Sequence, residues 1–311
     1  MKTQTFKKLM LIPALAFGLV ACNSNDNPEP MPENDIVDIV VASSQFNTLE
    51  AALIQADLVE TLRGAGPFTV FAPNDDAFGS FLTSNNLTAE QLLANPALGD
   101  ILTYHVVGSS VMASQVSPGA VATVNTANFY VSQDPAGDFW INGSARIIDT
   151  DISASNGVIH VLNNVIVPPS QSIAEIAVGM TEGEEPEFTQ LVGALSRAGL
   201  VGAVSGDDGN FTVFAPTDAA FQALYTALGV NGYNDIDLET LTAVLTAHVV
   251  EIRAFSQDLR QGDALETLNP EATLDIDLAA LTVGGAALNA DMLNIHATNG
   301  VIHVLNEVIV P

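Results

Sequence analysis

Short apolar runs separated by polar and turn-forming residues mark the strands that this chain is expected to contain. In FTVFA (residues 68–72), nearly every position on both alternating faces is apolar or β-branched, which is typical of a strand covered on both sides. Residues 108–155 and 251–298 alternate short apolar runs with Gly, Asn, Asp and Pro, which predicts strands and turns. Because each half of the chain starts helical and ends rich in strands, the pattern predicts an α+β fold.

Polar residues beside these runs predict where helices begin and end. Pro73 ends the first strand, and Asn74 follows as an N-cap with acidic residues in the next helical turn. Thr88 and Gln91 have the spacing of a capping box, and Pro96 is expected to split the helix that they start. Each half closes on an apolar strand, expected at residues 158–167 and 301–310.

The chain is a tandem repeat. GPFTVFAPNDDAF (66–78) returns as GNFTVFAPTDAAF (209–221), and NGVIHVLNNVIVP (156–168) returns as NGVIHVLNEVIVP (299–311), each 143 residues later. ILTYHVV at residues 101–107 falls opposite VLTAHVV at the same offset. The repeated unit is therefore a whole domain, and we expect domains at residues 36–168 and 173–311 with little linker between them.

The N-terminus predicts export and anchoring. Residues 1–21 carry three lysines and then an apolar run too short to span a bilayer, which is typical of a signal peptide. The run ends in LVAC, which resembles the bacterial lipoprotein processing box, so Cys22 is the expected lipidation site. Residues 22–35 read as an unfolded tether. We expect a lipid-anchored protein of the cell envelope, in the outer membrane, facing the periplasm or the surface.

The net charge of the chain limits the classes of partner that it could bind. Beyond residue 21 the chain carries all 36 acidic side chains against five arginines and no lysine, a formal charge of −31. So acidic a surface is repelled by phosphate backbones and anionic headgroups, which disfavours nucleic acid and electrostatic membrane binding. We interpret the acidity as a solubility device and expect membrane contact through the lipid only.

Few residues of the sequence are candidates for catalysis or metal binding. The repeated pairs His105/His248 and His160/His303 are open to two interpretations, metal ligands or a base on one side and core hydrogen bonding on the other, and we favour the second. Acidic pairs that could hold Ca²⁺ lack EF-hand spacing, so we interpret them as solvated loops; they are Asp149/Asp151, Asp207/Asp208 and Asp235/Asp237. Hydrolase, zinc and nucleotide motifs are missing, and we expect no metal and no cofactor.

FTVFAPxDxAF, the YH-bearing helix end and NGVIHVLNxVIVP, in this order, resemble the signature boxes and central motif of fasciclin domains. The resemblance implies two tandem fasciclin-like domains, each a wedge of β-sheets flanked by helices, with a role in cell-surface adhesion. It also implies a candidate adhesion motif at Tyr104, His105 and His248, since the Tyr-His region of animal members is linked to integrin binding. The second copy departs from this motif, because Ala247 precedes its histidine.

Our leading hypothesis is a non-catalytic, lipid-anchored binding and adhesion module that contacts matrix, biofilm or glycan components, with an unidentified extracellular protein or polysaccharide as ligand. The alternative is an enzyme or enzyme accessory acting on extracytoplasmic polysaccharide. Glycan-binding faces usually expose aromatic rings. Only the first copy offers a candidate ligand patch of this kind, formed by Phe129, Tyr130, Phe139 and Trp140, although core packing is the favoured interpretation for most of these rings.

Overall fold

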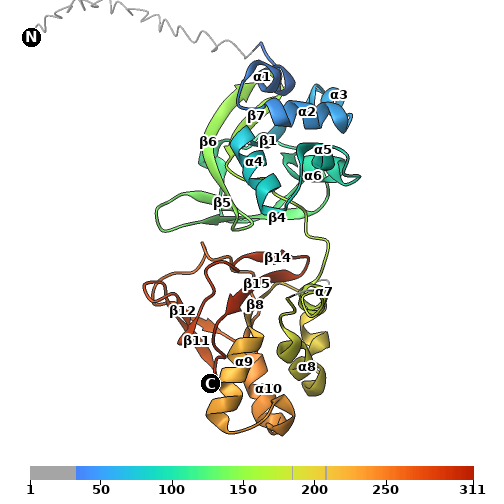
Figure 1. Ribbon diagram of the computed structural model, residues 1–311. Helices are drawn as coiled ribbons and strands as arrows, with labels where there is room; N and C mark the ends of the chain where they lie inside the picture. Colours follow the sequence, from blue (N-terminus) through green and yellow to red (C-terminus); the bar gives the residue numbers. More distant parts are fainter. Residues whose placement is uncertain (1–32, 184, 207–208) are drawn as a thin grey trace, which may run out of the picture. The chain divides into compact units, whose positions relative to one another are not determined.

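The structure is a computed structural model that describes residues 33–183, 185–206 and 209–311, all within one compact unit. The expected signal peptide, most of the tether and Cys22 lie outside the described residues. Both repeats run from helices into strands (Figure 1). Repeat 1 consists of α1 (Ile36–Ala42), α2 (Asn47–Gln55), α3 (Val59–Leu62), β1 (Phe68–Pro73), α4 (Asp75–Ser84), α5 (Ala89–Leu93), α6 (Leu98–Tyr104), β2 (Val106–Val107), the 3₁₀ turn η1 (Ala113–Gln115), β3 (Gly119–Ala122), β4 (Asn128–Gln133), β5 (Phe139–Ile141), β6 (Ala145–Ala154) and β7 (Gly157–Leu162).

Repeat 2 follows a similar order, with 3₁₀ turns in place of two of the short helices and one more strand. Its elements are α7 (Ile173–Gly179), α8 (Thr189–Ala198), η2 (Val201–Val204), β8 (Phe211–Pro216), α9 (Asp218–Leu228), η3 (Tyr233–Asp235), α10 (Leu238–Ala247), β9 (Val249–Val250), β10 (Ala264–Glu266), β11 (Thr273–Asp277), β12 (Thr282–Val283), β13 (Ala286–Ala287), β14 (Ile295–Ala297) and β15 (Gly300–Leu305). The α+β class and the tandem arrangement predicted from the sequence are confirmed.

The two repeated sequence boxes are neighbouring strands. β1 pairs in parallel with β7, from Phe68 opposite Gly157 to Pro73 opposite Leu162, and β8 pairs with β15 in the same register. The closing strands are shorter than predicted, because both end at the leucine of the box rather than five residues later. In repeat 1, the side chain of Asn163, directly after the strand, accepts a hydrogen bond from the Arg146 amide.

The sheets of the two repeats differ in continuity. In repeat 1 the seven strands form one sheet, in the order β2-β1-β7-β6-β5-β4-β3. The ten-residue strand β6 joins its two halves, with register shifts on either side of Asp149. In repeat 2 the strands form two separate four-stranded sheets, β14-β15-β8-β9 and β10-β11-β12-β13. Irregularities such as the register shifts of β6 bend a strand. The bend allows this single long strand to pair in both halves of the repeat 1 sheet.

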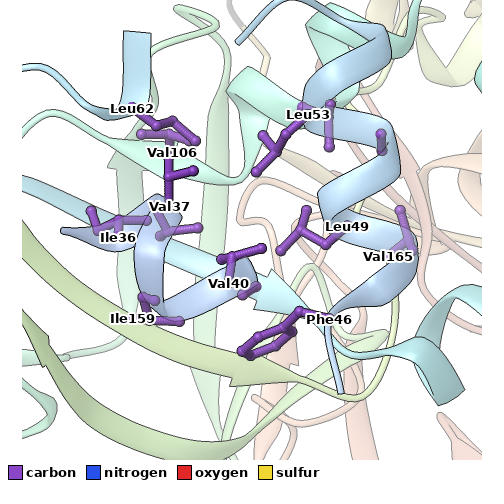
Figure 2. Packing of buried hydrophobic residues seen from close by; sticks show 14 of the residues in the cluster. Ile36, Val37, Val40, Phe46, Leu49, Leu53, Leu62, Val106, Ile159 and Val165 are labelled. Atoms are coloured by element: carbon purple, nitrogen blue, oxygen red, sulfur yellow. The ribbon is translucent and has the colours of Figure 1, made fainter. Parts of the chain in front are cut away.

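Each repeat has its own core on both faces of the β1–β7 or β8–β15 pair. In repeat 1, Val70 and Ala72 point into a cluster that includes α1 and α2, part of which is shown in Figure 2. Phe71, between them, points into a second cluster with Tyr104 and Phe129. No core cluster of the described residues contains side chains of both repeats. The first strand is thus covered on both faces, as its sequence predicts.

Local signals predicted the helix ends correctly. The Asn74 side chain accepts a hydrogen bond from the Ala77 amide at the start of α4, and Thr217 caps α9 in the same way. Thr88 and Gln91 form the expected capping box of α5, and the helix breaks before α6 in the segment that contains Pro96. These contacts involve residues three positions apart, so they depend little on the tertiary fold.

The Asn-Gly pair that opens the closing box ties the helical segment to the sheet. Asn156 accepts a hydrogen bond from the Ile36 amide and donates to the carbonyls of Leu62 and Gly64. Gly157 follows because a Cβ there would lie 2.1 Å from the Phe68 carbonyl oxygen, too close for any other residue. The requirement for this pair is therefore structural.

Candidate functional site

The histidine of the Tyr-His motif lies inside the molecule. His105 is 2% exposed, its Nδ1 lies 2.7 Å from the Ile101 carbonyl, and its Nε2 accepts a hydrogen bond from the Ile166 amide at 3.1 Å. His248 makes the same contacts with Val244 and Ile309. Burial lowers the pKa of both imidazoles to about 4, so they are neutral at pH 7, with the proton on Nδ1. Neither ring can touch an external ligand.

The ring nitrogens of the second pair of histidines are also hydrogen-bonded. His160 Nε2 lies 2.7 Å from the Val111 carbonyl and its Nδ1 accepts from the Asp151 amide at 3.3 Å. His303 repeats this arrangement with Ala254 and Asn294. Since both nitrogens of each ring are hydrogen-bonded to the backbone, neither keeps a free lone pair for a metal. The core interpretation of the four repeated histidines agrees with these contacts.

Tyr104 also belongs to the core. It is fully buried, its hydroxyl donates to the Asn128 carbonyl at 2.9 Å, and the Asn142 side chain donates to that hydroxyl at 3.0 Å. Burial raises the pKa of the phenol well above its ordinary value. The candidate adhesion motif of Tyr104, His105 and His248 is therefore corrected: these side chains are buried and make no surface on which a ligand could rest.

The acidic pairs have structural partners. Asp151 accepts a hydrogen bond from the Ala113 amide, Asp235 accepts from Asn231, and Asp237 caps α10 through the Thr240 amide. Asp207 and Asp208 lie outside the described residues. Within the described ranges, no three His, Cys, Asp or Glu side chains gather as a metal site would require.

The candidate ligand patch is divided between two faces of the sheet. Phe129 is fully buried, so its assignment to an exposed patch is wrong, and Phe139 packs against the same core cluster. Alternation along β4 and β5 places Tyr130 and Trp140 on the opposite face. The Trp140 indole donates to Asp134 at 2.9 Å and remains partly exposed. The four rings do not form one platform.

Tyr130 contacts repeat 2. The Arg253 guanidinium lies over its ring, 4.3 Å from the centroid, in cation–π geometry. The rings of Phe255 and His296 lie 6.3 Å and 5.9 Å away, and His296 meets Tyr130 edge-on. We call this contact, together with the hydrogen bonds that surround it, the repeat interface.

Hydrogen bonds connect the two repeats around the Tyr130 ring. Ser132 donates to Asp258 at 2.8 Å, and Arg260 donates to the Gln133 carbonyl at 2.6 Å. Asn294 donates to the Gly143 carbonyl at 2.9 Å, where a Cβ on Gly143 would collide with the Asn294 side chain. Burial raises the pKa of Asp258, although its bonds to Ser132 and to the Phe255 amide oppose this.

The repeat 2 side of the interface departs from the repeat. At the same offset of 143 residues, repeat 1 has Ser110 and Ser153 where repeat 2 has Arg253 and His296. The remaining differences follow the same pattern: Met112, Gln115, Ser117 and Asp151 stand opposite Phe255, Asp258, Arg260 and Asn294. None of these residues belongs to the motifs that the two copies share, so those motifs do not point to them. Their departure from the repeat was the signal that could have found them.

His296 is the most unusual group of the interface. Both of its ring nitrogens are buried without a hydrogen-bond partner among the described residues. Burial, reinforced by the charge of Arg253, lowers its pKa to about 3. The ring is therefore held neutral and acts as an apolar contact.

Comparison with known proteins identifies the family. The model of the Fasciclin domain family matches residues 44–168 and 186–311. Protein sll1483 of Synechocystis is 44% identical over 139 residues, which cover 43% of this chain and 73% of that protein. Transforming growth factor-beta-induced protein ig-h3 of Oryctolagus cuniculus is 31% identical over 270 residues and human periostin 25% over 278 residues, covering 83% and 89% of this chain.

The chain spans 37% of ig-h3 and 31% of periostin, about a third of each relative's length. A solved structure, the FAS1 domain pair of the insect cell adhesion molecule fasciclin I, aligns over 85% of this chain and 96% of that one, with 15% identity and a TM-score of 0.38. Across the described ranges, none of the helices combines the length and the apolar character needed to cross a bilayer.

Proposed function

Since the chain belongs to the fasciclin-domain family, we propose that it is a non-catalytic adhesion module held at the bacterial cell envelope by a lipid on Cys22. In this proposal, the lipid is the only contact with the membrane and the anchor lies in the outer membrane. The ligand is an extracellular protein or polysaccharide of a matrix or biofilm.

One observation carries this proposal: the polar side chains that the two repeats share are used to hold the fold. Asn156 and the two repeated histidines of each domain bond to backbone groups of the same repeat. Because these side chains hold the fold, a ligand is recognised by other residues on the surface, as expected of a binding module. No described contact favours the alternative of polysaccharide chemistry.

The negative charge of the chain determines the salt conditions under which it can bind an anionic ligand. With a formal charge of −31 beyond residue 21, direct contact with an anionic glycan is repulsive at low salt. Two routes can remove this repulsion: screening, with a Debye length of about 10 Å at 0.1 M salt, or bridging of carboxylates by divalent cations. We favour screening, because the described acidic residues form no cluster with the ligands of a cation site.

The test is binding of the labelled chain, carrying Cys22→Ser, to an array of glycans and matrix proteins at rising ionic strength. We expect binding that strengthens equally with sodium chloride and with calcium chloride of the same ionic strength. A Trp140→Ala variant probes a ring of the former patch that is partly exposed and does not belong to the core cluster of Phe129 and Phe139. Release of shortened glycans from the array, or binding that is strongest without salt, would contradict the proposal.

A further inference from the structure

Repeat 1 contains a cavity of about 190 Å³ that the fold leaves unfilled. It lies between the 3₁₀ turn η1 and the strands β1 to β4. Its apolar lining comes from one aromatic and five branched side chains, those of Phe71, Val107, Val111, Val116, Val121 and Val131. Three of these, Phe71, Val107 and Val131, also belong to the core cluster behind the cavity. The cavity is thus an extension of the core toward the surface.

The polar groups of the cavity are confined to its rim. Gln115 and Ser117 line it and are both exposed. Gln115 Oε1 accepts a hydrogen bond from the Met112 amide, whereas its amide nitrogen has no bond within the described ranges. The backbone groups of Val111 are engaged by Thr69 and His160, so they point no free donor or acceptor inward. An apolar body would therefore fit inside, with one polar end at the rim.

Repeat 2 carries a larger, buried side chain at the position of one lining residue. The two segments correspond residue by residue, because Ala254 bonds to Thr212 and His303 as Val111 bonds to Thr69 and His160. At this offset Val116 is replaced by Leu259, which is 2% exposed and packs in the repeat 2 core. Val116 is smaller and only partly buried. The lining of the cavity thus departs from the repeat at Val116.

Size and charge define what could enter. An apolar cavity of roughly 150 Å³ is enough to bind benzene, so 190 Å³ accommodates one small ring or a short alkyl chain. The apolar cavity in repeat 2 beside α7 and α8 has only about 40 Å³ and admits no such molecule. The acidity of the chain disfavours an anion.

We propose that this cavity of repeat 1 is a binding site for a small uncharged molecule with an apolar body and a single polar end. Gln115 and Ser117 hold the polar end at the rim, and the valines surround the body. This site lies inside one repeat and uses none of the residues of the repeat interface.

The test follows the valine methyl signals of the chain by NMR during titration with phenol. We expect saturable shifts at Val116, Val121 and Val131, and affinity at least about tenfold weaker for benzoate, which has the same ring with a negative charge. Val116→Phe places a ring in the cavity and should weaken phenol binding at least about tenfold. Val116→Leu, which copies repeat 2, should have a smaller effect of the same sign.

The matched control is Ile148→Phe, which adds the same bulk at an exposed position of β6 that does not line the cavity. It should bind phenol as the parent does, and Val116→Phe should unfold at the same or a higher temperature than the parent. Phenol shifts that do not saturate, that persist unchanged in folded Val116→Phe, or that appear equally in repeat 2 would overturn the proposal.

Discussion

A few polar side chains in each repeat hold segments that are far apart in the sequence. Asn156 joins the start of α1, the end of α3 and the closing strand, and Asn299 does the same in repeat 2 with the amide of Ile173 and the carbonyls of Val204 and Gly206. His105 joins the end of α6 to the chain after β7. Because these bonds are buried, losing one partner leaves a backbone group without a substitute.

Replacing His105 or His248 by alanine should lower the free energy of unfolding by about 1–3 kcal/mol, the cost of leaving the buried amide and carbonyl without a partner. Denaturant unfolding followed by circular dichroism measures this free energy. The His105 and His248 variants are compared with each other, since each removes the same contact from a different repeat. Unchanged stability together with lost ligand binding would assign these histidines a direct role in recognition.

At the scale of elements, the carboxylate in the first box connects two helices. Asp75 begins α4, but its oxygens accept hydrogen bonds from the amides of Asn47 and Thr48 at the start of α2. Asp218 does the same for the Gln190 amide of α8. Burial alone would raise the pKa of Asp75, but the bonds from Thr48 and Asn47 outweigh it and lower the pKa. The sequence showed Asp75 only as a partner of its own helix.

Asp75→Ala should cost about 0.5–2 kcal/mol of unfolding free energy, as the loss of a helix cap does, because α2 loses the acceptor for its first amides. Asp76→Ala is the matched control, since Asp76 is exposed in the same turn of α4 and should change stability by less than about 0.5 kcal/mol. Equal losses from both variants would show that helix-dipole charge, not the link to α2, is what matters.

Local sequence signals predicted strands, caps and the break at Pro96 because each depends on neighbouring residues. The predicted closing strands were too long, and the contact that follows the strand in repeat 1, between Asn163 and Arg146, joins residues far apart in the sequence. The prediction of an aromatic ligand patch was wrong because it also depended on contacts between residues far apart in the sequence. Alternation shows that Phe129 and Tyr130 face opposite ways, but not which face the core covers and which one repeat 2 covers.

At the scale of the whole molecule, the repeat interface depends on a neutral histidine. His296 faces Tyr130 from β4 and, from the segment after β9, Phe255 and the positive charge of Arg253; Asp258 and Arg260 lie in the same interface. Its pKa is about 3 in the interface and has the ordinary value of 6.5 when exposed to water. Protonation therefore favours separation of the repeats.

We expect the interface to be intact above pH 6.5 and to weaken by at most about tenfold per pH unit as the pH falls from 6.5 toward 3, because Phe255 and Arg253 stay beside His296 in repeat 2. Small-angle X-ray scattering at pH 7.5 and 4.5, with circular dichroism to confirm that both repeats stay folded, measures the separation. His296→Phe keeps the ring and removes the proton, so it should remain closed at pH 4.5. The same acid response in parent and variant would assign the effect to other groups, such as Asp258.

Retention of bacteria under flow is the decisive test of a lipid-anchored adhesion module. Bacteria that carry the parent chain or its Cys22→Ser variant are passed over glycan and matrix-protein surfaces in physiological salt, with equal amounts of chain verified in both strains. We expect retention on at least one surface with the parent and loss of that retention with the variant. Equal retention of both strains would contradict anchoring through Cys22, and retention by neither on any surface would contradict adhesion itself.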